Sequence, residues 1–520
     1  MLSRRQLHVI LAALMLALML AALDQTIVAT ALPTISSDLG GLDSLSWVVT
    51  AYLFAATAST PIWGKLSDLH GRKLMLQISV AVFVAGSALA GISQDLPQLV
   101  ATRAIQGLGG GGILVLVLAV IADLVPPRQR GRYAGLFGAV FGLASVVGPL
   151  LGGYFTQHLT WRWIFYINIP LGIAAFAVLA VVLHLPARHE RKPIDWIGAS
   201  LLVVGIVMTL LALVWADHPF SWHSPQILGL FVGGVVVLTL FVLHELRAPE
   251  PLVNMNLFRN PVFRLSCGVG FIVGFTMLGS IIFLSVYLQV VGGASPMQAG
   301  LQLLPFMVGI LLTSVASGRL ITRTGRYKVY PIVGTATATL GLFLLSRLGV
   351  DPTYSQIALG MFVLGAGLGG VMQVLVVAMQ NSVDVKELGS ATSASTLIRS
   401  MGSSFGAAGF GAVWGASLAY ALNGVLPAGV SLLDITSSAA SLSSIDALPQ
   451  PTHDAAIGAF AHATSTTFLV AVPIMLIAFV LTLFLPEVEL RRTHETDTSP
   501  GSDSTVPLPT LESRRWTVDQ

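Results

Sequence analysis

Asp24 is the residue of this 520-residue sequence whose position most strongly suggests chemistry. It lies inside an apolar run that begins near Leu7, and neither neighbour is charged. A carboxylate at membrane depth is unfavourable by about 2.5 kcal/mol or more, so such residues usually mark a proton or substrate pathway. No other carboxylate lies so deep in an apolar segment. The alternative is that Asp24 lies at headgroup level or caps a break, but apolar Ile27 and Val28 follow it and favour the pathway.

Two arginines also lie within apolar segments. Arg103 is a few residues into a segment near 97–123, so its side chain either snorkels to the cytoplasm or lies in the interior near Asp24. In the interior it would stabilise the Asp24 charge or respond when Asp24 takes a proton. Arg399, about nine residues into a segment near 391–421, either contacts substrate or anchors a helix.

Several polar or aromatic residues within apolar segments could line a cavity together with Asp24 and Arg399. They are Tyr52, Gln106, Gln289, Gln302 and Gln373. The sequence does not show which of them face inward, and helix packing explains each of them at least as well.

Patterns typical of enzymes are absent or lack their required context. There is no Walker A motif and no His-Glu-x-x-His zinc motif. Two Gly-x-Gly-x-x-Gly matches, 107–112 and 365–370, do not follow a strand, and the Gly-x-Ser-x-Gly match at 402–406 lies in a helical segment. The single cysteine, Cys267, fits no disulfide or metal cluster. We therefore expect no enzyme, cofactor, metal site or nucleic-acid partner, and a proton gradient rather than ATP as the energy source.

The composition predicts an all-α integral membrane protein. Hydrophobic residues make up 54% of the chain and charged residues only 10%, against about 25% in soluble domains. Apolar runs of about 20 residues predict fourteen spans in the bilayer. These lie near 8–31, 45–65, 74–93, 97–123, 133–156, 163–184, 195–215, 226–245, 263–290, 298–321, 329–347, 355–380, 391–421 and 464–485.

The basic residues predict the orientation of these spans. Most of the 27 Lys and Arg residues fall in alternate loops, which the positive-inside rule assigns to the cytoplasm. Both termini are then cytoplasmic, which agrees with an even number of spans. The first apolar run resembles a signal peptide, but it is longer than a normal one and Asp24 interrupts it, so we expect a retained helix.

Internal repeats predict two six-helix halves with a helix pair between them. Residues 64–73 and 318–326 both begin with Gly-Lys/Arg-Leu and contain a later Gly-Arg, and residues 107–112 match 365–370. The predicted parts are a cytoplasmic N-terminus at 1–7, a first bundle at 8–184, an inserted pair with linkers at 185–260, a second bundle at 261–486 with an external loop at 422–463, and a disordered cytoplasmic tail at 487–520.

These motifs resemble the major facilitator superfamily, and within it the fourteen-span drug:proton antiporter family, over about residues 8–485. Residues 64–73 resemble the family's loop motif, with Leu69 where many members have Arg. Arg103 with Gln106 and residues 107–109 resembles the motif of the fourth helix. Residues 148–153 resemble the antiporter motif, with Ala144 where Gly is common, and 23–28 and 161–170 resemble signatures of the fourteen-span branch.

The resemblance implies a conformational latch that joins the halves on the cytoplasmic side. Asp68 would face the start of the helix at Gly389-Ser390, where the helix dipole favours an anion, and Arg72 would pair with Asp123. Such contacts would hold the outward-facing state and break on inward opening. The full latch set is Gly64, Asp68, Gly71, Arg72, Lys73 and Asp123. The alternative is a loop whose charges only set topology.

The antiporter motif implies that the fifth span seals against the second half. Gly148, Gly152 and Gly153, with Gly142, would let a neighbouring helix approach closely, and Pro149 would kink the helix. A purely structural kink is the alternative.

Together these features predict a proton-coupled antiporter that exports lipophilic, cationic drugs across the cytoplasmic (inner) membrane by alternating access. Asp24 and Arg103 would couple the proton. The alternatives are an exporter of an endogenous metabolite, antibiotic or lipid, and a non-transporting sensor or assembly subunit. The partners expected are substrate, protons and the bilayer, with a periplasmic adaptor if the host has an outer membrane; the protein is expected to be a monomer.

Overall fold

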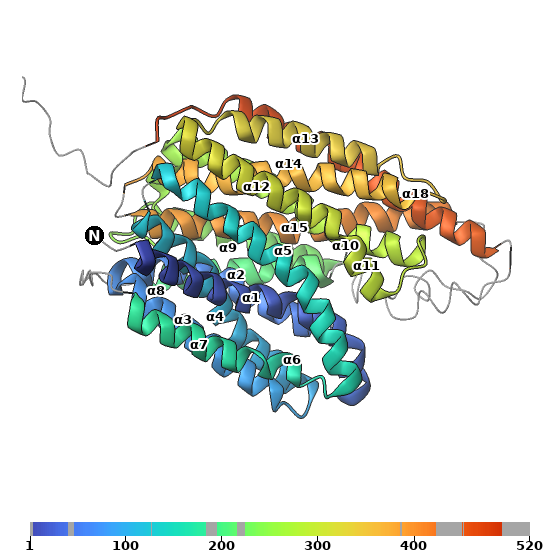
Figure 1. Cartoon of the computed structure of the whole chain (residues 1–520), viewed down its shortest axis with the longest axis horizontal. Helices are drawn as coiled ribbons and strands as arrows, with labels where there is room; N and C mark the ends of the chain where they lie inside the picture. The colour runs from blue at the N-terminus through green and yellow to red at the C-terminus, as the bar shows by residue number, and fades with distance from the viewer. Residues whose placement is uncertain are drawn as a thin grey trace, which may run out of the picture.

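The computed structural model describes residues 4–39, 46–125, 127–183, 195–215, 224–384, 387–422, 450 and 452–490. This part of the chain contains helices and no strand (Figure 1). The helices are α1 (Arg4–Leu39), α2 (Ser46–His70), α3 (Arg72–Gly91), α4 (Leu96–Leu124), α5 (Pro127–His158), α6 (Trp163–Tyr166), α7 (Asn168–Val182), α8 (Trp196–Trp215), α9 (Pro225–Glu245), a 3-10 turn η2 (Met255–Arg259), α10 (Pro261–Val290), α11 (Pro296–Gln302), α12 (Leu304–Thr324), α13 (Val329–Leu345), α14 (Tyr354–Asn381), α15 (Leu388–Leu422) and α18 (Thr452–Leu483).

The helices form two bundles, each with its own apolar core. One core is built from α1 to α4 and α7, and the other from α10, α12 to α15 and α18. In Figure 1 the blue-to-teal helices lie below the yellow-to-red ones. Packing of α5 against α12 and of α2 against α15 joins the two bundles.

The inserted helices α8 and α9 pack on each other, and α8 touches both bundles. Leu202 and Ile206 of α8 share a buried cluster with Ala58 of α2 and with Leu397 of α15. The pair therefore lies where the two bundles meet rather than as an independent domain.

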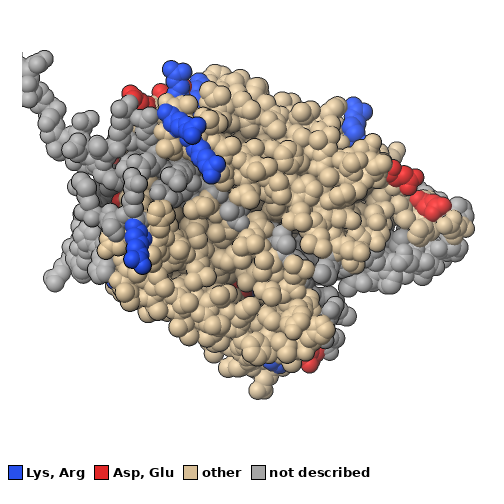
Figure 2. All heavy atoms as spheres, viewed as in Figure 1, with Lys and Arg blue, Asp and Glu red and all other residues tan. Residues whose placement is uncertain are grey.

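Eleven helices of the described part are long and apolar enough to cross a membrane. The helix Val329–Leu345 is apolar but shorter, and α2 and α5 are long helices that are not among the eleven. The predicted count of fourteen is therefore not established by length and apolarity. Most Lys, Arg, Asp and Glu side chains on the face shown in Figure 2 lie towards the two ends of the molecule, with an uncharged band between them.

Close helix packing explains the repeated glycine motif. A Cβ at Gly107 would collide with the backbone oxygen of Tyr52 in α2, and a Cβ at Gly365 would collide with that of Phe306 in α12. Neither match is a nucleotide-binding turn, because both lie inside helices α4 and α14. The two copies therefore serve the same purpose, which is to bring backbones together.

The prediction of an external loop over 422–463 is wrong at its end. Helix α18 begins at Thr452, well before the predicted span, because Phe460 and its small neighbours pack against Leu418 of α15. Residues 423–449 lie outside the described part.

The predicted tail also begins too early. Val488 N–H donates to Tyr327 Oη at 3.1 Å, and that hydroxyl donates to Pro486 O at 2.6 Å. Leu490 is buried beside them. Residues 487–490 thus pack on the second bundle, while 491–520 lie outside the described residues.

Candidate functional site

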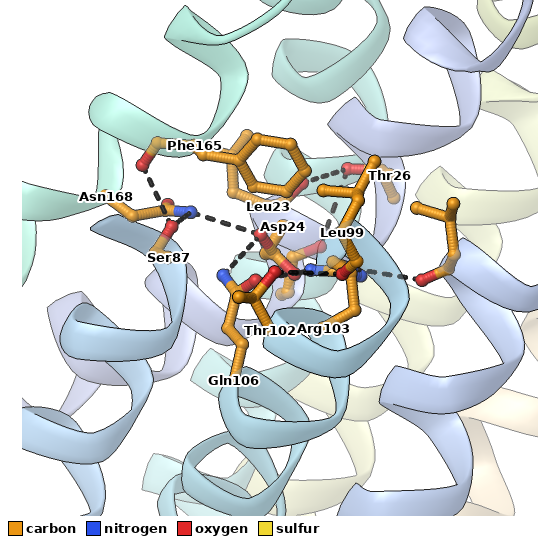
Figure 3. A network of polar contacts seen from close by, with 12 residues as sticks. Leu23, Asp24, Thr26, Ser87, Leu99, Thr102, Arg103, Gln106, Phe165 and Asn168 are labelled. Atoms are coloured by element: carbon orange, nitrogen blue, oxygen red, sulfur yellow. Dashed lines mark hydrogen bonds and ion pairs between the residues drawn. The ribbon is translucent and has the colours of Figure 1, made fainter. Parts of the chain in front are cut away.

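Asp24 is completely buried in α1 and forms an ion pair with Arg103 of α4. Arg103 Nη1 lies 2.6 Å from Asp24 Oδ2, and the two side chains are 1% and 0% exposed (Figure 3). A buried charge is tolerated only when it is paired and hydrogen-bonded. The interior position predicted for Arg103 is therefore confirmed, and the alternative of snorkelling to the cytoplasm is wrong.

The second oxygen of Asp24 is held by two amides. Gln106 Nε2 donates to Oδ1 at 2.8 Å, and Asn168 Nδ2 donates to the same atom at 3.1 Å (Figure 3). The Asn168 amide also lies 3.0 Å from Ser87 Oγ, which donates to Phe165 O at 2.9 Å. We call Asp24, Arg103, Gln106 and Asn168 the acid–base cluster.

The guanidinium of Arg103 is oriented by groups on three sides. Its Nη1 donates to Gln106 Oε1 at 2.6 Å, and its Nε donates to Val48 O at 3.1 Å. Its Cζ lies 4.5 Å from the centre of the Tyr52 ring, a cation–π distance. The glycines of α4 make this possible, because Gly107 and Gly110 bring α4 against the backbone and hydroxyl of Tyr52.

The structure brings only some of the predicted cavity residues to this cluster. Tyr52 and Gln106 belong to it, whereas Gln289 donates to Ser285 one turn away on α10. Gln302 accepts from Tyr354 through its backbone oxygen. Gln373 and Arg399 lie in α14 and α15 of the second bundle, with no contact to Asp24 among the described interactions.

Asn168 is the member of the cluster to which the sequence interpretation assigned no role. It lies within the 161–170 segment, where it is the first residue of α7 after the short helix α6. A lone asparagine in an apolar span would have been the available signal, since membrane helices place such groups against polar partners.

The latch contacts implied for the loop motif are present. Arg72 bridges Asp68 and Asp123 at 2.6 and 3.1 Å, and Ser390 N–H at the start of α15 donates to Asp68 Oδ2 at 3.1 Å. Gly389 has no room for a side chain beside Asp68 and Arg72. The two ion pairs of Arg72 lie within the first bundle, and the Ser390–Asp68 hydrogen bond crosses from the first bundle to the second.

The remaining latch residues differ in part from the prediction. Gly71 forms the turn, with φ +94°, which a glycine adopts without steric penalty. Gly64 lies inside α2, where a Cβ would be 2.6 Å from that of Ser393 in α15. Lys73 does not join the halves, because its Nζ donates to Ala180 O of α7 at 2.6 Å.

Helix α5, which carries the antiporter motif, packs against α12 of the second bundle as the motif implies, but the closest approach at its glycines is within the first bundle. Gly148 lies against Thr26 and Ile27 of α1, within its own bundle. A Cβ at Gly142 would be 3.9 Å from Met307, an ordinary contact, and one at Gly153 would meet nothing within 4 Å.

The motif also contains Gly152 and Pro149. Gly152 is buried and its carbonyl accepts from Thr156 Oγ1 at 2.9 Å. The side chain of Pro149 lies outside the described part. Helix α5 as a whole does lie along α12 (Figure 1).

The family model of the Major Facilitator Superfamily matches residues 14–407. The chain belongs to this superfamily. Two solved structures share the fold. The human organic anion transporter MFSD10 has a TM-score of 0.62 and 15% identity, and the match covers 91% of this chain and 99% of MFSD10. The proton:xylose symporter XylE has a TM-score of 0.59 and 14% identity, and the match covers 94% of this chain and 97% of XylE. At these identities the likeness shows the fold alone.

Relatives with higher identity are also facilitator proteins. The chain is 41% identical to an uncharacterized MFS-type transporter of Mycobacterium tuberculosis, over 96% of this chain and 72% of the relative. It is 39% identical to the multidrug transporter protein MdtP of Bacillus subtilis, over 78% and 74%. It is 34% identical to the acurin A biosynthesis cluster MFS-type transporter of Aspergillus aculeatus, over 78% and 72%.

Membership of the superfamily makes this protein a multi-pass membrane transporter of small molecules and not an enzyme. The acid–base cluster lies inside one bundle of the facilitator fold, and the latch contacts lie where its two bundles meet.

Proposed function

We propose that this facilitator exports lipophilic small molecules in exchange for protons and that Asp24 carries the proton. The observation that supports this most is the buried Asp24–Arg103 ion pair, with both side chains at most 1% exposed. An ionisable pair inside a membrane bundle is a typical element of a proton relay.

Proton binding at Asp24 would change the balance of charge in the cluster. Neutral Asp24 no longer compensates Arg103, and an uncompensated buried cation is strongly unfavourable. Arg103 must then move or find another partner, which would shift α4 relative to α1. A ligand shifts a conformational equilibrium only through such a difference between states.

The latch is the proposed second part of this equilibrium. Asp68 bonds to Ser390 across the bundle junction only while α2 and α15 are close, so opening on that side must break the contact. Alternating access then couples the state of Asp24 to the state of the latch. The membrane potential contributes about 2.3 kcal/mol per charge per 100 mV, which could drive export of substrate.

Relatives support export without defining the substrate. One is named a multidrug transporter, and another is a transporter of a biosynthesis cluster, which keeps an endogenous metabolite as the second candidate cargo. The proposed setting is the cytoplasmic membrane, with both termini in the cytoplasm, a monomer, and an adaptor only in a host with an outer membrane. In this conformation the enclosed Asp24 offers no free negative charge to a cationic drug.

The test uses everted membrane vesicles with a pH-sensitive dye, energised before a lipophilic probe is added; a cationic probe (ethidium) and an anionic probe (pyrenebutyrate) are tested separately. Wild type should show probe-induced dequenching, and Asp24→Asn should not. Asp351→Asn, which removes an exposed carboxylate between α13 and α14, is the matched control and should behave as wild type. Equal dequenching in Asp24→Asn at equal expression would refute the assignment of Asp24.

A further inference from the structure

Arg399 is a second arginine within the membrane bundles, but its surroundings differ from those of Arg103. It lies 11 residues into α15, which at 1.5 Å per residue is about 17 Å from the start of the helix. Arg399 therefore lies well inside a helix that is long enough to cross a membrane.

The guanidinium of Arg399 has no acceptor among the described residues. The interaction recorded for this residue is through its backbone oxygen, which accepts from Ser403 Oγ at 3.2 Å. The described carboxylates of the second bundle all lie near helix ends or in connections, at Asp351, Asp384, Glu387, Asp454, Glu487 and Glu489. Arg103, in contrast, has a carboxylate, an amide and a backbone oxygen.

The side chain is enclosed by protein but not completely covered. The surrounding protein desolvates the guanidinium, yet the residue keeps part of its surface exposed. Protein atoms therefore surround the guanidinium without sealing it off completely. The backbone is fixed there, because Gly274 of α10 lets the two helices touch at the Arg399 carbonyl.

Helix α15, which carries Arg399, packs against α2 of the first bundle. Leu397 and Met401 of this helix contribute to the cluster that contains Ala58 of α2 and partly buried Phe54. Transporters of this kind bind substrate near the midplane, at the interface of their repeats.

We infer that Arg399 is the binding site for the negative charge of the transported substrate, so that the cargo is a lipophilic organic anion or a zwitterion with an anionic group. This inference rests on the proposed export function and specifies its substrate class. A guanidinium in a desolvated site binds a carboxylate or sulfonate through two parallel N–H donors. Asp24 cannot select a cation in this conformation, because both of its oxygens are already bonded.

A purely structural role would require polar contacts of the Arg399 guanidinium that stabilise the fold, and the described residues provide none. Replacing Arg399 by glutamine should therefore leave the melting temperature of the purified protein unchanged or raised. The same change at Arg103 should lower it, because Asp24 loses its ion pair. This comparison shows that any loss of binding in Arg399→Gln is not a loss of folding.

The binding experiment uses two probes with the same apolar body and opposite charge, pyrenebutyrate and pyrenebutyl-trimethylammonium. Their dissociation constants are measured on the purified full-length protein in detergent, without a proton gradient, by fluorescence. Wild type should bind the anion, and Arg399→Gln should weaken that binding about 10- to 100-fold while leaving the cation unaffected. Arg399→Lys should recover part of the affinity, since it restores the charge but not the fork.

Arg347→Gln is the matched control, because Arg347 follows α13 and stacks on Phe343, away from the bundle junction. It should bind the anion as wild type does. No binding of pyrenebutyrate to wild type, or equal affinity in Arg399→Gln, would overturn the inference. Proton exchange in vesicles with the cationic probe would then still support the proposed function, so the two can fail separately.

Discussion

Asp24→Asn should destabilise the protein, and a second change at Arg103 should recover most of the loss. The single substitution keeps the shape of the side chain but leaves the 1% exposed guanidinium without a counter-ion. Removing one partner of a buried ion pair lowers the free energy of unfolding by about 3–5 kcal/mol. Val48 O and the Tyr52 ring remain as partial compensation, which places the expected loss at the lower end, about 3 kcal/mol.

Arg103→Gln leaves the Asp24 carboxylate with two amide donors, Gln106 and Asn168, so its loss should be somewhat smaller. The double variant removes both charges and can keep a neutral hydrogen bond. The double variant should therefore lose less unfolding free energy than the two single variants lose together. We expect the difference to be about 2 kcal/mol or more.

The assay is reversible unfolding in mixed micelles, with all four proteins compared at one pH. Strict additivity of the two losses would refute the reasoning, because it would mean that the two side chains do not stabilise each other. Vesicle exchange should be lost in both single variants and in the double variant, so recovery of stability without recovery of exchange separates folding from function.

The packing between the bundles allows two further predictions. Asp68→Asn should increase deuterium uptake in the first turn of α15, because the Ser390 N–H loses its charged acceptor at 3.1 Å. Unchanged uptake there would mean that this contact does not hold the bundles together. Gly64→Ala should reduce transport and folded yield, because its Cβ would be 2.6 Å from that of Ser393, and Ser393→Gly should partly restore both. Gly153→Ala, where a Cβ meets nothing within 4 Å, is the matched control; similar effects of the two alanines would contradict this account.

The helices could be predicted closely from the sequence because the bilayer fixes how long an apolar run must be. The predicted segment 97–123 corresponds to α4, Leu96–Leu124, and 263–290 corresponds to α10, Pro261–Val290. The start of α18 could not be predicted, since Phe460 and its alanine neighbours form a helix by packing on α15 rather than by apolar length.

The acid–base cluster could be predicted in its charges but not in its full membership. A buried carboxylate needs a paired charge, which favoured the interior position of Arg103 near Asp24 over snorkelling to the cytoplasm. Asn168 is far away in sequence, and its contact depends on how α7 packs on α1 and α3. The partners of Gly148 depend on helix rotation in the same way, which a glycine motif alone does not specify.

Uphill transport by the purified protein tests the central claim most directly. Proteoliposomes with an imposed pH gradient and no other energy source would be given pyrenebutyrate and, separately, its trimethylammonium counterpart. We expect the wild type to accumulate one of these probes against the concentration gradient of the probe, and this accumulation to stop when the pH gradient is dissipated. We expect Asp24→Asn to accumulate neither probe. Accumulation by Asp24→Asn, or accumulation by wild type that ignores the pH gradient, would contradict proton-coupled export through Asp24 and Arg103.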